Sequence, residues 1–236
     1  MRNILIISIR EFKSYFGSPW SYLVSAAFLL VSGYGFGWSP ETYLQTTIQG
    51  FLLWAGFFLL FWAPAVTMRL ISEEEKLGTL ELLLTAPVKE YEVIGGKYLA
   101  ALGIFTVMLL ITLVYALLLE WFGDPDWGPI VSGYIGIFLL GAVFLSIGLF
   151  TSSVTSNQIV AFILGSMTLL VFWFIGKTAA MVESGTGKVL SIISISAYYP
   201  AFGRGIIDSR AVIYYVSLVM VFLFLAVRSL ETRRLR

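Results

Sequence analysis

Six long apolar stretches restrict what this chain can fold into more than any other feature of its sequence. They cover residues 20–38, 48–68, 98–119, 130–150, 159–176 and 211–227, and no charged residue interrupts the middle of any of them. About 20 apolar residues in a helix cross the hydrocarbon core of a bilayer, and one charge placed there costs about 2.5–3.5 kcal/mol. The sequence therefore predicts an all-α, polytopic membrane protein with six transmembrane helices in a single domain.

A large soluble protein with six buried helices is the alternative. Of the 236 residues, 58% are hydrophobic and only 12% are charged. A soluble chain of this length is closer to half apolar and a quarter charged. The polar residues are too few to cover six such helices, so we reject this alternative.

Histidine and cysteine are both absent from the sequence. Their absence removes the usual near-neutral general base, every thiol nucleophile and the commonest soft metal ligands. The segment Gly185-Thr186-Gly187-Lys188 resembles a phosphate-binding loop, but Val182 and Val189 replace the glycine and the Ser or Thr that such a loop needs. We predict no enzyme activity, metal or cofactor in this chain. The net charge of +1 predicts no nucleic-acid partner.

Lysine and arginine are distributed unequally between the two sides of the six predicted spans. One side holds eleven of them: Arg2, Arg10, Lys13, Arg69, Lys76, Lys89, Lys97, Arg228, Arg233, Arg234 and Arg236. The other side holds four: Lys177, Lys188, Arg204 and Arg210. Because cytoplasmic segments carry the excess of positive charge, we predict that both termini are cytoplasmic, with residues 230–236 as a cytoplasmic tail.

The N-terminal segment, residues 1–18, has the pattern of an amphipathic helix. Leu5, Ile9, Phe12 and Phe16 recur at helical spacing, whereas the charged residues occupy other faces. We expect an interfacial helix that leads into the first span. An ordinary polar tail is the alternative.

Residues 72–88 lie between spans 1–2 (residues 20–68) and spans 3–5 (residues 95–181), on the predicted cytoplasmic side. Ser72 and Glu75 have the spacing of a capping box, and Pro87 would stop the helix. We expect one short amphipathic helix with Gly78 on its polar face. From physical chemistry alone, a docking surface for a partner and a solvated surface helix remain equally good readings.

The same segment resembles a known family. Its motif Glu-x-x-x-Gly-Thr-x-Glu-x-Leu-x-x-x-Pro is formed by Glu74, Gly78, Thr79, Glu81, Leu83 and Pro87. This motif resembles the coupling-helix signature of ABC-2-type transporter permeases, and the resemblance extends over nearly the whole chain. The nearest branch is the group of permeases of gliding-motility-associated ABC exporters.

The resemblance implies a permease subunit that pairs with a second, identical or related permease and docks on a separate cytoplasmic ABC ATPase. ATP and Mg would then bind to the ATPase. The implied docking residues are Glu73, Glu74, Glu75, Gly78, Thr79, Glu81, Leu82, Thr85 and Pro87, with Ser152, Ser153, Thr155 and Asn157 in a second contact loop. A plain turn is an equally good reading of that loop. The location would be the plasma membrane, the inner membrane in bacteria, in contact with its lipids.

The resemblance also implies a pair of short re-entrant helices in residues 182–210, before the last span at 211–229. Tyr198, Tyr199, Pro200, Arg204 and Asp208 would form an external gate. If the chain is helical there, Arg204 and Asp208 have the i, i+4 spacing of an ion pair.

Three functions compete on this basis. The first is a permease subunit that exports a substrate with energy from a separate ATPase. The second is a force-transmitting membrane subunit of an ATPase-driven complex that moves no substrate. The third, a membrane enzyme, is disfavoured because histidine, cysteine and clustered inward carboxylates are missing.

Overall fold

The computed structural model describes residues 2–38, 47–79, 88–179 and 192–234. Within these ranges the chain is all-helical, with no strand. The helices are α1 (Arg2–Gly17), α2 (Pro19–Trp38), α4 (Gln49–Thr67), α5 (Ser72–Lys76), α7 (Glu90–Phe122), α8 (Trp127–Val154), α9 (Gln158–Ala179), α11 (Ile195–Gly203) and α12 (Ser209–Arg234).

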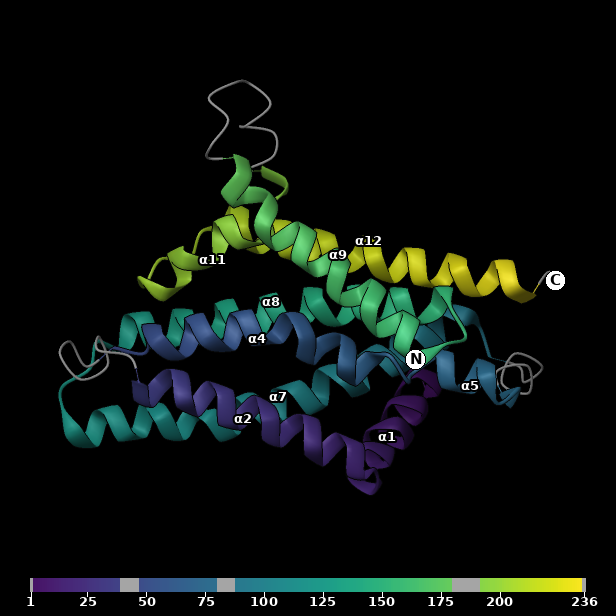
Figure 1. Cartoon of the computed structure of the whole chain (residues 1–236), viewed down its shortest axis with the longest axis horizontal. Helices are drawn as coiled ribbons and strands as arrows, with labels where there is room; N and C mark the ends of the chain where they lie inside the picture. The colour runs from purple at the N-terminus through teal and green to yellow at the C-terminus, as the bar shows by residue number, and fades with distance from the viewer. Residues whose placement is uncertain (1, 39–46, 80–87, 180–191, 235–236) are drawn as a thin grey trace.

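Six of these helices, α2, α4, α7, α8, α9 and α12, are long and apolar enough to cross a membrane. Each covers one of the six predicted apolar stretches, with α4 lacking only the first and last residue of its stretch, so the predicted polytopic fold is confirmed. Most of them run along the long axis of the molecule, and α9 crosses that axis obliquely (Figure 1). The beginning of α1 and the end of α12 lie at the same end of the bundle, which agrees with an even number of spans.

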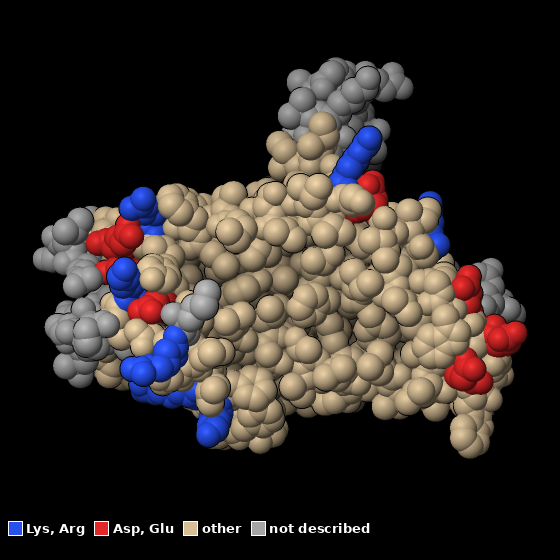
Figure 2. Space-filling view, turned by 180° about the vertical axis from the view of Figure 1, so that it is seen from behind, with Lys and Arg blue, Asp and Glu red and all other residues tan. Residues whose placement is uncertain are grey.

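Charged residues gather toward the two ends of the bundle. Figure 2 shows a broad band of uncharged residues between these ends on the visible face. Many large apolar side chains of the six long helices are exposed, including Leu30 of α2, Leu117 of α7 and Val171 of α9. This surface suits the hydrocarbon core of a bilayer, where no water is available to polar groups.

Helix α8 forms the centre of the bundle and packs against α4, α7, α9, α11 and α12. Glycines on α8 allow this close approach. A Cβ at Gly141 would lie 2.1 Å from the ring of Phe105 in α7, and one at Gly136 would lie 2.5 Å from Phe202 in α11. Small residues at such contacts are typical of helices that pack inside membranes.

Helix α1 is the predicted N-terminal helix, and it meets α2 at a sharp bend (Figure 1). Leu5, Ile9 and Phe16 are exposed, as expected for a face that contacts lipid. Phe12, which the sequence placed on the same face, instead packs against α7 at Gly103. Helix α1 therefore has a second apolar contact, with the bundle itself.

Helix α11 is a short helix within the predicted re-entrant segment, and it lies against α8 and α9. Its Ile195, Tyr199 and Phe202 side chains are buried against the bundle. Residues 182–191, which the prediction of two re-entrant helices also includes, lie outside the described residues.

Candidate functional site

The end of the bundle that carries α1 and α5, hereafter the α5 end, contains the residues with the motif described above. Helix α5 follows α4 after a turn of four residues, and Ser152 of α8 holds this junction together. The Ser152 hydroxyl accepts hydrogen bonds from the backbone N–H groups of Ile71 and Ser72, both at 3.2 Å, and donates to the carbonyl of Met68 at 3.0 Å. These three bonds fix α5 to both α4 and α8.

The predicted capping box at Ser72 does not form. The N-cap of α5 is Ile71, which makes no side-chain capping bond, and Ser72 is already the first helical residue. The Ser72 hydroxyl instead donates to the carbonyl of Met68, four residues earlier. This prediction was wrong because the chain continues almost directly from α4, so a backbone carbonyl of the preceding turn is within reach of Ser72.

Gly78 terminates α5, contrary to the expectation that it lies inside a longer helix. Its φ is +71°, a left-handed conformation that costs other residues about 1–2 kcal/mol. The backbone N–H of Gly78 donates to the carbonyl of Glu75 at 3.1 Å and closes the last turn. Thr79 is exposed, and its hydroxyl donates to the carbonyl of Glu74 at 3.2 Å.

Four further residues of the predicted docking set lie outside the described residues: Glu81, Leu82, Thr85 and Pro87. Among the described ones, Glu73, Glu74 and Glu75 are half-buried, whereas residues 76–79 are exposed. Leu77 is 68% exposed. An apolar side chain displayed at the charged end of the bundle is a candidate contact for a partner.

A buried lysine connects α5 to two other helices. The ammonium of Lys97 in α7 forms ion pairs with Glu74 of α5 at 2.7 Å and with Glu11 of α1 at 3.1 Å, and the Lys97 side chain is 1% exposed. Separating these helices would leave buried charges without a partner, which is unfavourable. The ion pairs therefore hold α1, α5 and α7 together. We call Lys97, Glu11 and Glu74 the Lys97 triad.

A second contact between α1 and α7 supports the Lys97 triad. The side-chain amide of Asn3 donates to the carboxylate of Glu92 at 3.0 Å. Gly96 of α7 lies beneath α1, where an added Cβ would be 2.7 Å from Ile7. The close approach of the two helices brings Glu11 within reach of Lys97.

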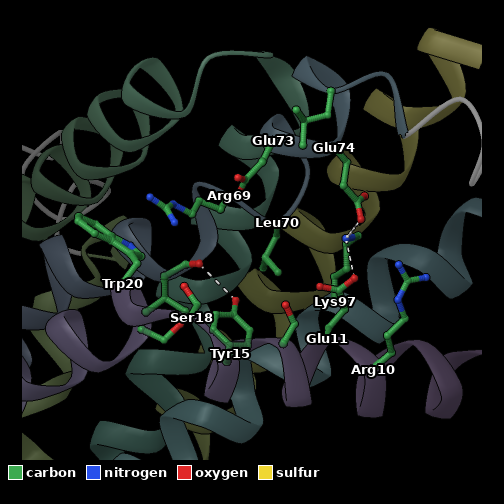
Figure 3. Close-up of a pocket in the computed structure, with 14 residues that line it drawn as sticks. Arg10, Glu11, Tyr15, Ser18, Trp20, Arg69, Leu70, Glu73, Glu74 and Lys97 are labelled. Atoms are coloured by element: carbon green, nitrogen blue, oxygen red, sulfur yellow. Dashed lines mark hydrogen bonds and ion pairs between the residues drawn. The ribbon is translucent and has the colours of Figure 1, made fainter.

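A pocket of about 380 Å³ opens beside the Lys97 triad, between α1, α2, α4 and α5. Figure 3 shows Trp20 and Arg69 at one end of this pocket and Lys97 with Glu11 and Glu74 at the other. The Arg69 guanidinium lies 4.9 Å from the centre of the Trp20 ring. The Tyr15 hydroxyl donates to the carbonyl of Val66 at 3.2 Å. Burial, aided by Glu11, raises the pKa of Tyr15, so its hydroxyl stays protonated and able to donate.

The turn between α8 and α9 was the second predicted docking element. Ser152 and Ser153 are both buried, and Ser153 donates to Phe150 within its own helix at 2.7 Å. Direct contact of these two side chains with a partner does not fit their burial. Asn157 is exposed and caps α9 by accepting from the backbone N–H of Ile159 at 2.9 Å, and Thr155 accepts from the N–H of Asn157 at 3.2 Å.

The residues of the predicted external gate lie at the opposite end of the bundle, around α11. The Tyr199 hydroxyl donates to the carbonyl of Leu52 in α4 at 2.8 Å. The rings of Tyr198 and Tyr214 are 4.9 Å apart. Pro200 is exposed within α11. These contacts fasten α11 to α4 and α12.

The expected ion pair between Arg204 and Asp208 is absent from this described segment. Helix α11 ends at Gly203, and Gly205 adopts a φ of +88°, so the two residues do not share a helix. Asp208 instead accepts from the backbone N–H of Arg210 at 2.9 Å at the start of α12.

Comparison with protein families agrees with this architecture. A family model described as ABC-2 family transporter protein matches residues 39–227, about four fifths of the chain. The chain belongs to the ABC-2 transporter family. It is therefore a multi-pass membrane protein and a permease subunit of an ABC transporter, a family whose members associate with an ATPase subunit. No curated protein matches the chain.

Several residues of the α5 end in this ABC-2 permease were not singled out as functional from the sequence. Lys97 and Arg69 were counted only among the flanking cations, and Glu11 was not singled out. One signal was present: Gly95-Gly96 directly precedes Lys97, and paired glycines at the start of a span indicate that another helix approaches closely. The identity of that helix, α1, could not be read from the sequence.

Proposed function

We propose that this ABC-2 permease couples ATP hydrolysis by a separate ABC ATPase to the export of a substrate, with residues 73–87 as the main docking element. The observation that supports this most strongly is the Lys97 triad. Through Glu74, the first residue of the family motif, α5 is in direct ionic contact with the transmembrane helix α7. If α5 moves, α1 and α7 must move with it, or the buried ion pairs break.

The α5 end provides two mechanical connections to the spans. Ser152 joins the α4–α5 junction to α8 through three hydrogen bonds. Lys97 joins α5 to α7 and α1 through two ion pairs. A docked ATPase that moves α5 would therefore also move α4, α7 and α8. Transmission of such a movement requires tight packing between these helices.

The exposed tip of the segment supplies the docking surface. Residues 76–79 project from the bundle and include the exposed Leu77, and Thr155 with Asn157 in the α8–α9 turn would add a second contact at the same end. ATP and Mg would be held by the ATPase. A second permease subunit and the lipids of the plasma membrane complete the proposed assembly.

The proposed orientation places the α5 end in the cytoplasm. The eleven Lys and Arg residues of the sequence on the α5 side, against four on the other, support it. Because the chain has no cysteine, single-cysteine variants can test orientation and docking together. Thr79→Cys places a thiol at the α5 end, and Asp124→Cys is the matched control at an exposed position of the opposite end.

In intact cells, a membrane-impermeant maleimide should label Asp124→Cys and leave Thr79→Cys unlabelled. In native membranes, a short bifunctional crosslinker should join Thr79→Cys, but not Asp124→Cys, to an ATPase present at one copy per permease. If Thr79→Cys gives no ATPase adduct while the tagged chain also purifies without an ATPase, the docking proposal is wrong.

Reconstitution separates export from force transmission without cargo. The permease–ATPase complex, placed in vesicles, should move a candidate cargo across the membrane in an ATP-dependent manner. Steady ATP hydrolysis that depends on the intact α5 segment, without movement of any candidate cargo, would favour the force-transmitting function instead.

A further inference from the structure

Two buried polar atoms without partners line the same pocket at the α5 end. They are Nε of Arg69, which is a hydrogen-bond donor, and Oε2 of Glu74, which is an acceptor. A buried polar group without a partner is unfavourable, and native proteins rarely leave one unsatisfied. A ligand that offers an acceptor to Arg69 and a donor to Glu74 would satisfy both.

The charges of the pocket also favour a ligand with two opposite charges. The lining residues include three cations, Arg10, Arg69 and Lys97, and three carboxylates, Glu11, Glu73 and Glu74. Equal numbers of the two charges give a purely anionic or purely cationic ligand no overall advantage. The two unpartnered groups are nevertheless separated in space, since Arg69 lies beside Trp20 and Glu74 lies at the far end of the pocket (Figure 3).

The ion pairs of the Lys97 triad leave specific groups available for a ligand. Lys97 is engaged by Glu11 and by Oε1 of Glu74. The guanidinium of Arg69 stacks on Trp20, an arrangement that leaves its N–H edge free to bind a phosphate. Glu73 lines the pocket between Arg69 and Glu74, where it could accept from an ammonium group.

A second pocket of about 370 Å³ adjoins the first one at Trp20 and lies between α2, α4 and α9. Its lining consists of apolar side chains, among them Trp20, Leu23, Phe58, Phe61, Met68 and Phe162. Trp20 lines both pockets, and Met68 of the apolar pocket directly precedes Arg69 of the charged one. A charged pocket beside an apolar one, with Trp20 lining both, matches the two parts of a phospholipid.

The location of the two pockets suits a lipid as well. Trp20 stands at the beginning of the α2 span, and tryptophan is enriched at the depth of lipid headgroups. The exposed apolar side chains of α1 place that helix at the same depth. The charged pocket therefore lies where headgroups lie, and the apolar pocket extends toward the hydrocarbon core.

From these observations we infer a phospholipid site at the α5 end, specific for a headgroup that carries both a phosphate and a primary ammonium. The phosphate binds Arg69, the ammonium binds Glu73 and Oε2 of Glu74, and an acyl chain occupies the apolar pocket. This inference goes beyond the proposed function and does not depend on docking of an ATPase.

The test uses the full-length chain in detergent micelles that contain equal amounts of phosphatidylethanolamine, phosphatidylcholine and phosphatidylglycerol with identical acyl chains. Native mass spectrometry then measures which lipid remains bound. We expect phosphatidylethanolamine to be retained about tenfold over the other two, the ratio that one or two charge-assisted hydrogen bonds provide. Phosphatidylcholine has no ammonium N–H to donate, and phosphatidylglycerol has no ammonium.

Substitutions separate the three parts of the site. Arg69→Gln should lower retention of phosphatidylethanolamine about tenfold, and Glu73→Gln should abolish the preference over phosphatidylglycerol. Ala27→Phe, which fills the apolar pocket, should also lower lipid retention. Arg210→Gln, an exposed arginine at the opposite end, is the matched control and should change nothing. Circular dichroism identifies any variant that fails to fold.

Equal retention of phosphatidylglycerol and phosphatidylethanolamine by the unmodified chain would overturn the inference, and this comparison needs no variant. The water-soluble headgroup glycerophosphoethanolamine tests the source of the ligand. Displacement of the lipid by an equal concentration of this compound would assign the site to a soluble ligand and likewise overturn it.

Discussion

Replacement of Lys97 by methionine is the sharpest test of how the α5 end is held together. Methionine keeps an apolar stem of similar length but removes the ammonium that lies between Glu11 and Glu74. The two carboxylates then face one site without a cation. Removing one partner of a buried ion pair costs about 3–5 kcal/mol. We expect a loss of about 3 kcal/mol for Lys97→Met, at the lower end of that range, because the carboxylates are 19% and 24% exposed and so retain some hydration.

The charge contribution can be separated from packing by removing the carboxylates as well. In the triple variant Lys97→Met, Glu11→Gln, Glu74→Gln, no uncompensated charge remains. Replacing a buried ionic cluster by neutral groups is often close to neutral. We therefore expect the triple variant to regain about 2 kcal/mol relative to Lys97→Met, a non-additive result typical of residues in direct contact.

The assay is reversible unfolding in mixed micelles by increasing the SDS fraction, followed by the far-ultraviolet circular dichroism signal. Arg228→Met is the control, since it removes an ion pair to Glu231 in which the side chains are 61% and 38% exposed. We expect a change below about 0.5 kcal/mol for that exposed pair. If Lys97→Met changes the unfolding free energy as little as the control, the triad does not hold the helices together. If the triple variant is no more stable than Lys97→Met, the loss comes from packing of the lysine stem rather than from charge.

Three further predictions use the same unfolding assay. Gly96→Ala should destabilise the chain by about 1–3 kcal/mol through overpacking, because the added Cβ would lie 2.7 Å from Ile7 of α1. The neighbouring Gly95→Ala, whose Cβ would meet nothing closer than 3.9 Å, should be neutral or slightly stabilising. Equal effects of the two substitutions would contradict the α1–α7 packing. Gly78→Ala should cost about 1–2 kcal/mol because of the positive φ, and no loss would show that α5 continues past this residue. Ser152→Ala should cost about 1–3 kcal/mol, since two buried N–H groups lose their acceptor; Ser153→Ala removes only a bond within one helix and should cost clearly less, and the reverse order would refute the role of Ser152 at the α4–α5 junction.

The positions of the six spans could be read from the sequence because a membrane span is a local property. About 20 consecutive apolar residues are enough to form a membrane span, whatever the helix contacts. The helix α1 was also predicted, but its contacts were not. Phe12 belongs to the same helical stripe as Leu5 and Ile9 in the sequence, and only the position of α7 decides that Phe12 faces the protein.

The docking motif illustrates the limit of local reasoning. The spacing of Ser72 and Glu75 satisfies a capping box, yet the carbonyl of Met68 offers the Ser72 hydroxyl a nearer partner once α4 has been placed. Gly78 was expected inside the helix on its polar face, whereas its positive φ makes it the end of α5. From the sequence, Ser152 was assigned to a polar contact loop. In the structure its hydroxyl is buried against α4 and α5.

By itself, the sequence determined that this chain is an all-helical membrane protein and which segment carries a family motif, because hydropathy and short spacings depend on neighbouring residues only. The tertiary structure alone decided which charges meet. Glu11 and Lys97 are 86 positions apart. The preceding Gly95-Gly96 pair indicates that a helix approaches Lys97, but nothing local identifies that helix or the carboxylates it brings. The ion pairs of Lys97 exist because Gly96 lets α1 approach α7 and because Ser152 holds α5 above them, and contacts of this kind depend on the packing of several helices at once.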